Sequence, residues 1–177
     1  MTILPESVQP SLRRVPDWRL LLSHPAHFLS LGLGSGLMRP APGTWGSLAS
    51  WPLYLLMAHW LTPMQIVWAC LPLFVLGVFC CARTGKALGV VDHGAIVWDE
   101  MVACWLLFAL TPAALWSQLL ALLLFRLFDI SKPWPIRWLD ARMKNGFGVM
   151  LDDLLAMLFA WVVHILLWPR LLPLLPH

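Results

Sequence analysis

Two pairs of adjacent carboxylates, Asp99-Glu100 and Asp152-Asp153, stand out among the few charged residues of this chain. Each pair borders a long stretch without charge, 101–125 for the first and 154–169 for the second. Adjacent carboxylates repel each other, and a hard divalent cation with oxygen ligands relieves that repulsion. The alternative is a helix N-terminal cap, where negative charge gains about 0.3–1 kcal/mol. Either pair taken alone leaves both interpretations open.

A second group combines cations with an anion. Arg126, Asp129 and Lys132 recur every three residues, so they share one face of a helix until Pro133 ends it. Such a face suits a centre that binds a metal ion and a phosphate group. The alternative is an ion-pair ladder along one helix, which contributes only about 0.2–0.5 kcal/mol per pair. Arg137 follows two prolines and is a further candidate to bind phosphate.

Three further polar residues are candidates with weaker signals. Thr44 and Ser47 follow a glycine-rich stretch, 32–36, at the start of an apolar segment. Free backbone N–H groups at such a helix start can bind an anion, and a Thr or Ser N-cap explains the same residues equally well. His93 lies in a short acidic stretch and can act as an acid or base near neutral pH.

These residue types suit a reaction on a lipid phosphate, because phosphoryl transfer depends chiefly on positioning and charge neutralisation. No cysteine is followed six positions later by arginine, which excludes a thiol-phosphate enzyme, and the absence of any Asp-x-Asp pair weakens an aspartyl-phosphate route. A metal-activated water that attacks phosphorus is the simplest remaining mechanism.

The elements that must position these groups are strongly apolar. Of the 177 residues, 60% are hydrophobic and only 12% are charged, and the mean hydropathy is +0.76. A soluble domain carries about 25% charged residues, so lipid must replace water around much of this chain. No polar linker divides the chain, which predicts a single domain, 1–177. The scattered basic residues exclude a nucleic-acid partner.

The charge-free stretches predict helices. The first, 40–82, is long enough for two passes with a hinge at Thr62-Pro63. The second, 101–125, either crosses once or folds back at Thr111-Pro112. Basic residues in both flanking polar stretches favour the hairpin, which leaves all polar loops on the cytoplasmic face. We predict an all-α, multi-pass transmembrane bundle. Its five helices span about 44–60, 64–82, 96–110, 113–128 and 152–168, with four helices as the alternative.

The first 25 residues carry Arg13, Arg14 and Arg19 and lack the apolar core and cleavage site of a signal peptide. We expect this segment to lie at the cytoplasmic face, with its arginines near anionic headgroups. The four cysteines lie within apolar segments, where a thiol acts as a small hydrophobe.

Four motifs, taken in chain order, resemble the signatures of the phosphatidylglycerophosphatase A family. They lie at 34–36 with 42–47, at 92–100, at 125–137 and at 148–153, and the resemblance covers about residues 20–170. It implies a bacterial inner-membrane enzyme that uses Mg²⁺ to hydrolyse phosphatidylglycerophosphate to phosphatidylglycerol and inorganic phosphate. Bilayer lipids are then its only other expected partners.

The resemblance supports the five acids as the acidic centre and Arg126 and Lys132 as phosphate partners, and the individual roles given below are inferred from the chemistry of the side chains. Mg²⁺ is expected to bind carboxylates, and one carboxylate or His93 is expected to accept a proton from the attacking water. A small ion transporter is an alternative, but its acids would lie at the bilayer midplane. A non-catalytic scaffold is another, and it would tolerate neutral substitutions. The expected metal-binding and catalytic acids are Asp99, Glu100, Asp129, Asp152 and Asp153, and the expected phosphate ligands are Arg126, Lys132, Arg137, Thr44 and Ser47.

Overall fold

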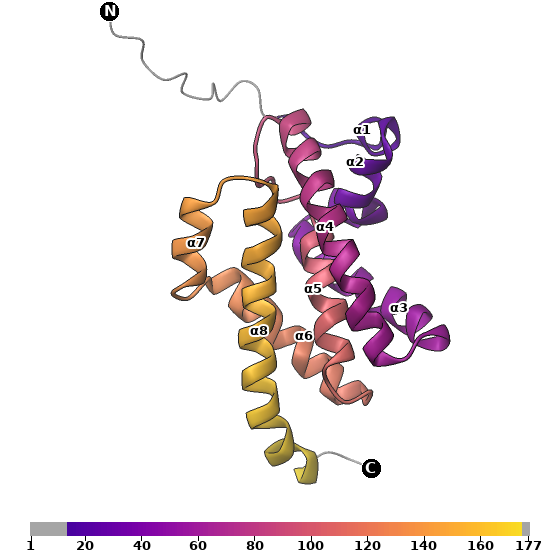
Figure 1. Cartoon of the computed structure of the whole chain (residues 1–177), viewed down its shortest axis with the longest axis vertical. Coiled ribbons are helices and arrows are strands. Elements are labelled where there is room, and N and C mark those ends of the chain that lie inside the picture. The colour runs from indigo at the N-terminus through magenta and orange to yellow at the C-terminus, as the bar shows by residue number, and fades with distance from the viewer. Residues whose placement is uncertain (1–13, 175–177) are drawn as a thin grey trace, which may run out of the picture.

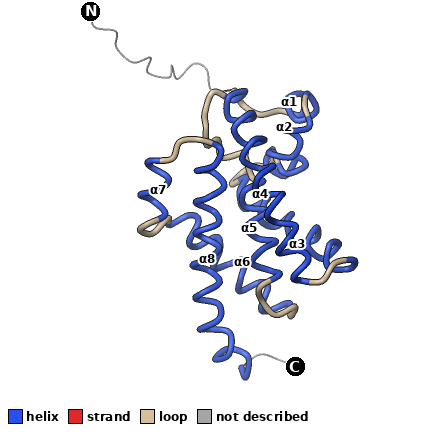
Figure 2. The backbone as a smooth tube through the Cα atoms, viewed as in Figure 1, coloured by secondary structure: helices blue, strands red, loops and turns tan. Residues whose placement is uncertain are grey.

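The computed structural model describes residues 14–174, and this part of the chain consists of helices and the loops that join them, without any strand (Figures 1 and 2). The prediction of an all-α fold is therefore confirmed for the described residues. In chain order the helices are α1 (Trp18–Ser23), α2 (Pro25–Ser30), η2 (Gly32–Leu37), α3 (Pro42–Trp60), α4 (Pro63–Leu88), α5 (Trp98–Ala109), α6 (Leu115–Ser131), α7 (Ile136–Arg142), α8 (Gly146–Leu171) and η3 (Leu172–Leu174).

Helices occupy all five predicted segments, and two of them are clearly longer than predicted. Helix α4 continues to Leu88, and α8 begins at Gly146. The predicted hinge is present, because the Thr62 hydroxyl accepts the N–H of Gln65 while the Gln65 side chain accepts the N–H of Thr62. This capping box starts α4. Helices α1, α2 and α7 have only six or seven residues. They are too short for a long charge-free stretch to predict them.

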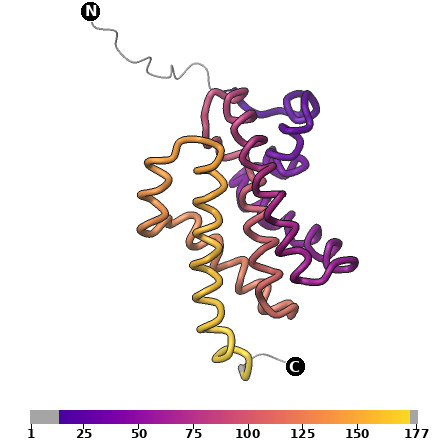
Figure 3. Tube along the Cα trace, viewed as in Figure 1, coloured from indigo at the N-terminus to yellow at the C-terminus, as the bar shows by residue number. Residues whose placement is uncertain are grey.

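The chain folds back between α5 and α6, as the hairpin prediction requires. Helix α5 ends at Ala109 and α6 begins at Leu115, so 101–125 is not one continuous helix. The start of α5 lies beside the end of α6, where Glu100 Oε1 is 3.1 Å from Arg126 Nη1. In Figure 3 the loop that precedes α5 also runs close to the start of α8. Both polar stretches therefore meet at one end of the bundle.

Helices α4 and α8 are long and apolar enough to cross a membrane, with 26 residues each. At 1.5 Å per residue each measures about 39 Å, which exceeds the ~30 Å thickness of a hydrocarbon core. Both run along the long axis of the molecule and contact each other and α5 (Figure 1). They are the two described helices that meet this criterion, so two of the five predicted spans are supported by length and composition.

Helix α5 lies at the centre and contacts α3, α4 and α8. Nine of its twelve residues are buried, which holds its first turn inside the protein. In contrast, the outer faces of α4 and α6 expose large apolar side chains such as Trp68, Phe79, Leu123 and Ile130. An apolar outer surface of this extent is typical of contact with lipid.

Helices α4 and α8 approach closely where α8 begins. A Cβ atom on Gly146 would lie 2.2 Å from the carbonyl oxygen of Val78 and 2.8 Å from the Cβ of Ala82. We expect Gly146→Ala to push the helices apart and lower the free energy of unfolding by about 1–3 kcal/mol, measured as a lower thermal unfolding midpoint in detergent. Gly94→Ala is the control, because no atom lies within 4 Å of its added Cβ. Equal midpoints for the two variants would contradict this packing.

Candidate active site

Asp152 and Asp153 lie inside α8 and do not cap it. The helix begins six residues earlier, and its N-cap is Asn145, whose side chain accepts the N–H of Gly148 at 2.8 Å. The two acids are 5% and 4% exposed. The prediction that the last helix starts at Asp152 is therefore wrong, and so is the interpretation of this pair as a cap. Buried carboxylates well inside a helix need another explanation.

Asp99 and Glu100 occupy the first turn of α5. Asp99 is 6% exposed and accepts the N–H of Glu100 at 3.0 Å. Glu100 turns toward two other helices, accepting the Ser47 hydroxyl of α3 at 3.0 Å and pairing with Arg126 of α6 at 3.1 Å. The start of a helix favours negative charge, which explains acids at this position. Capping does not explain the contacts that Glu100 makes with α3 and α6.

Arg126 connects three helices through its Nη1 atom. This atom lies 2.6 Å from Asp129 Oδ2, 3.1 Å from Glu100 Oε1 and 3.4 Å from the Ser47 hydroxyl. The ion pair expected between Arg126 and Asp129 is present, and the same guanidinium also binds a carboxylate from another helix. Its Nε is buried and has no hydrogen-bond partner. Arg126 therefore orders two carboxylates and keeps an unused donor.

A pocket of about 280 Å³ opens between α3 and α6 beside Arg126. Thr44 and Ser47 line its polar end, so the structure brings both candidates next to this arginine. The N–H groups of Thr44 and Trp45 donate to the carbonyl of Ala41. Both N–H groups are therefore already hydrogen-bonded within the chain. The polar end of the pocket is formed instead by the hydroxyl side chains of Thr44 and Ser47. The rest of the lining consists of Leu48, Leu119, Leu122 and Leu123.

The glycine-rich stretch packs η2 against the loop before α5. Gly34 has a φ of +106°, which favours glycine. A Cβ on Gly36 would lie 2.1 Å from the carbonyl oxygen of Ala95. The N–H of Val97 donates to the carbonyl of Ser30 at 2.9 Å. These contacts fix the loop that carries Asp99 into the bundle, a structural role that the sequence pattern did not reveal.

Lys132 leaves the helix face that carries Arg126 and Asp129. It is the C-cap residue of α6, with a φ of +39°, and its ammonium lies 2.5 Å from Asp152 Oδ2 and 3.6 Å from Asp140 Oδ2. Burial acts to lower the pKa of Lys132, but the Asp152 carboxylate outweighs it and raises the pKa above its usual value. The prediction of one shared face is wrong for Lys132, because the left-handed cap turns its side chain toward α8.

The five predicted carboxylates lie together, and Asp153 interacts electrostatically with the other four. Only Arg126 and Lys132 pair with members of the group within residues 14–174, and neither pairs with Asp99 or Asp153. We call this group the carboxylate centre: Asp99, Glu100, Asp129, Asp152 and Asp153.

The carboxylate centre offers oxygen donors to a divalent cation, and the carboxylate oxygens that approach within 4.8 Å of one another are those of Asp152, Asp92 and Asp140. Its donors are all oxygen atoms, the ligands that Mg²⁺ prefers, and its negative charge exceeds that of the two paired cations. One buried atom, Asp152 Oδ1, has no hydrogen-bond partner in the structure. An unpartnered carboxylate oxygen inside a protein is costly unless a cation or a donor occupies the site.

Asp92 and Asp140 adjoin the centre, although the sequence prediction did not select them. One oxygen from each lies within 4.8 Å of an oxygen of Asp152. Partial burial acts to raise the pKa of Asp140, but the neighbouring Lys144 and Lys132 lower it overall. Asp92 directly precedes His93 in the motif at 92–100, and this position could have identified Asp92 as a candidate site residue. Asp140 is a single acid on a short helix, which no spacing rule singles out.

His93 lies in the loop before α5 and Arg137 on helix α7. His93 lines a second pocket beside the start of α3. Its Nδ1 accepts the N–H of Ala95 at 3.1 Å, so the proton of the neutral ring sits on Nε2. This tautomer suits a hydrogen-bond donor better than a base. Arg137 is exposed on α7 and forms no ion pair with any residue that the structure describes.

Comparisons with known proteins cover most of the chain. Residues 28–168 match the model of the family described as Phosphatidylglycerophosphatase A. A phosphatidylglycerophosphatase A of Haemophilus influenzae is 45% identical over 150 residues, which cover 84% of this chain and 91% of the relative. That of Escherichia coli K12 is 42% identical over 158 residues, 88% of each chain. No solved structure matches the chain.

A third relative carries a different name. It comes from Bacteroides thetaiotaomicron, bears the provisional name phosphatidylinositol-3-phosphatase, and is 32% identical over 142 residues, which cover 76% of this chain and 88% of the relative. The family-matched region, 28–168, includes every residue of the carboxylate centre as well as Arg126 and Lys132.

Proposed function

Because this chain belongs to the phosphatidylglycerophosphatase A family, we propose that it uses Mg²⁺ to hydrolyse phosphatidylglycerophosphate to phosphatidylglycerol and inorganic phosphate. The observation that carries this proposal is the buried carboxylate centre, which faces Arg126 and Lys132 at one end of an apolar bundle. Carboxylates suit a hard cation, and neighbouring cationic side chains suit phosphate oxygens.

The proposed magnesium ligands come from the carboxylate centre. Asp99, Asp152 and Asp153 are the most buried members, and Lys132 is the one cation within residues 14–174 that pairs with any of the three. Glu100 and Asp129 share Arg126 and complete the set. When bound, Mg²⁺ lowers the pKa of a water molecule and neutralises phosphate oxygens.

The side chains of this chain then position the substrate and move one proton. Arg126 and Lys132 bind oxygens of the terminal phosphate and neutralise charge as the reaction proceeds. The oxygen of water bonds to phosphorus while the bond from phosphorus to the glycerol oxygen breaks. A carboxylate of the centre takes a proton from the water, and the departing glycerol oxygen receives that proton. The products are phosphatidylglycerol and inorganic phosphate.

The proposed location is the cytoplasmic face of a bacterial inner membrane, with a multi-pass bundle in the bilayer. Support comes from the position of Asp99 and Glu100 in the first turn of α5 and of Asp152 and Asp153 in the first third of α8, which places the carboxylate centre toward one end of the bundle. An ion transporter would instead place such acids at the bilayer midplane. Positive charge at the same end also favours the cytoplasmic side. The basic residues are Arg83, Lys86, Arg126, Lys132, Arg137, Arg142 and Lys144.

Metal removal tests the proposal. We expect purified protein in detergent micelles to release phosphate from phosphatidylglycerophosphate with Mg²⁺, and EDTA to lower the rate at least about 100-fold. Excess Mg²⁺ should restore it. Phosphatidylinositol 3-phosphate serves as a comparison substrate. Folded protein that releases no phosphate from phosphatidylglycerophosphate in Mg²⁺ would refute the activity, and an EDTA-resistant rate would refute the role of the metal.

A further inference from the structure

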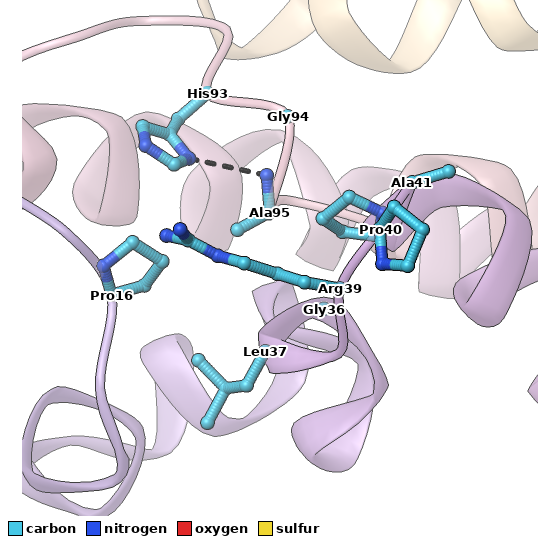
Figure 4. A pocket seen from close by; sticks show the side chains of 10 residues that line it. Pro16, Gly36, Leu37, Arg39, Pro40, Ala41, His93, Gly94 and Ala95 are labelled. Carbon is cyan, nitrogen blue, oxygen red and sulfur yellow. Dashed lines mark hydrogen bonds between the residues drawn. The ribbon is translucent and has the colours of Figure 1, made fainter.

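A second pocket, with a largely apolar lining, lies at the loop that leads to the carboxylate centre, and the mechanism above does not use it. Its volume is about 560 Å³, and it lies between the start of α3, the end of η2 and the loop before α5. Figure 4 shows the Arg39 side chain extending across this pocket toward Pro16 and the His93 ring. The lining residues are Pro16, Gly36, Leu37, Arg39, Pro40, Ala41, Pro42, His93, Gly94 and Ala95.

One exposed arginine, Arg39, gives the lining of this pocket a positive charge. Arg39 lines it, and no Asp or Glu does. Within residues 14–174, Arg39 forms no ion pair with a carboxylate. An anion is therefore the ligand that this pocket favours.

The pocket adjoins the carboxylate centre on two sides. Gly43 follows the lining residue Pro42, and a Cβ on Gly43 would lie 2.0 Å from Glu100 Oε1. On the other side, His93 follows Asp92, whose carboxylate lies within 4.8 Å of Asp152. The first turn of α3 and the loop before α5 therefore contribute residues both to the lining of the pocket and to the surroundings of the centre.

We propose that the Arg39 pocket binds a second phosphate group, while the phosphate to be hydrolysed lies at the carboxylate centre. This inference rests on the proposed function. Phosphatidylglycerophosphate carries a terminal phosphate and a phosphodiester separated by one glycerol, and the phosphodiester would be repelled if it lay among carboxylates. A guanidinium next to the centre provides a matching charge-assisted contact. Released inorganic phosphate has the same chemistry and is the other source of such a group.

The pocket would thereby select lipid headgroups that carry two phosphates. Arg39→Gln removes the charge and Arg39→Lys keeps it. Arg19→Gln is the matched control, because Arg19 lies on α1, stacks over Trp18 and does not line the pocket. All four proteins would be assayed by phosphate release from phosphatidylglycerophosphate in Mg²⁺. Three competing inhibitors would be compared: glycerol 3-phosphate, the deacylated headgroup with both phosphates, and inorganic phosphate.

Arg39→Gln is expected to raise KM for the lipid about 10-fold with kcat within about twofold of wild type. The deacylated headgroup should lose its advantage over glycerol 3-phosphate, and Arg39→Lys should recover most of it. Weaker inhibition by inorganic phosphate alone, with KM unchanged, would assign the pocket to the free ion and still support a phosphate site. Unchanged KM and unchanged inhibition in Arg39→Gln would overturn the inference, whereas an inactive wild type would refute the proposed function instead.

Discussion

Replacing Asp153 by asparagine is expected to lower kcat for phosphatidylglycerophosphate at least about 1,000-fold, equivalent to about 4 kcal/mol of transition-state stabilisation. Asp153 is 4% exposed and interacts with all four other members of the carboxylate centre. Asparagine has nearly the same shape but supplies no negative charge to a metal ion. The measurement is phosphate release in detergent at saturating lipid and Mg²⁺.

The stability of the same variant separates a catalytic role from a structural one. Without metal, Asp153→Asn removes one negative charge from a buried group of like charges, so its thermal unfolding midpoint in EDTA should equal or exceed that of wild type. Asp17→Asn is the control, because Asp17 caps α1 through its side chain and asparagine caps equally well. A less stable Asp153→Asn protein with normal kcat would contradict the assignment.

Replacing Arg126 by glutamine is expected to lower kcat/KM about 100- to 1,000-fold. This change removes the cation that Glu100 and Asp129 share, at 3.1 and 2.6 Å, and the donor that faces the pocket between α3 and α6. The substrate phosphate would then meet negative charge without a neutralising partner. The rate of phosphate release over a range of lipid concentrations measures this loss.

A second variant distinguishes loss of charge from loss of geometry. Arg126→Lys keeps the positive charge but lacks the planar guanidinium, in which Nη1 contacts Glu100, Asp129 and Ser47 while Nε remains an additional donor. We expect it to be folded and about 10- to 100-fold less active than wild type. Activity of Arg126→Gln within threefold of wild type would show that this arginine does not bind the phosphate.

Much of the fold follows from where charge is absent. The charge-free stretches predicted five segments that are all helical, and Thr111-Pro112 falls in the loop between α5 and α6. The basic residues on both sides of 101–125 correctly favoured a hairpin, which the contact between Glu100 and Arg126 requires. The same pattern predicted the members of the carboxylate centre, because an acid at the border of an apolar stretch is costly without a function.

Other features depend on tertiary contacts that no local pattern encodes. Gly146 and Gly148 resemble a loop, since glycine has low helix propensity. They nevertheless begin α8, and the close approach to Val78 explains why residue 146 has no side chain. The left-handed cap at Lys132 redirects its ammonium from α6 to α8. Asp140, on the short helix α7, pairs with both Lys132 and Lys144 beside the site.

The central claim is that the carboxylate centre holds a divalent cation at the site where the lipid phosphate binds. Titration of purified, metal-free protein with Mn²⁺, followed by electron paramagnetic resonance, tests it independently of activity, because oxygen-rich magnesium sites also accept this ion. Wild-type protein is predicted to bind Mn²⁺ in a saturable way that Mg²⁺ competes away, and Asp153→Asn is predicted to bind it at least about 10-fold more weakly. Equal Mn²⁺ affinity in the two proteins, or no saturable binding to wild type, would contradict the claim.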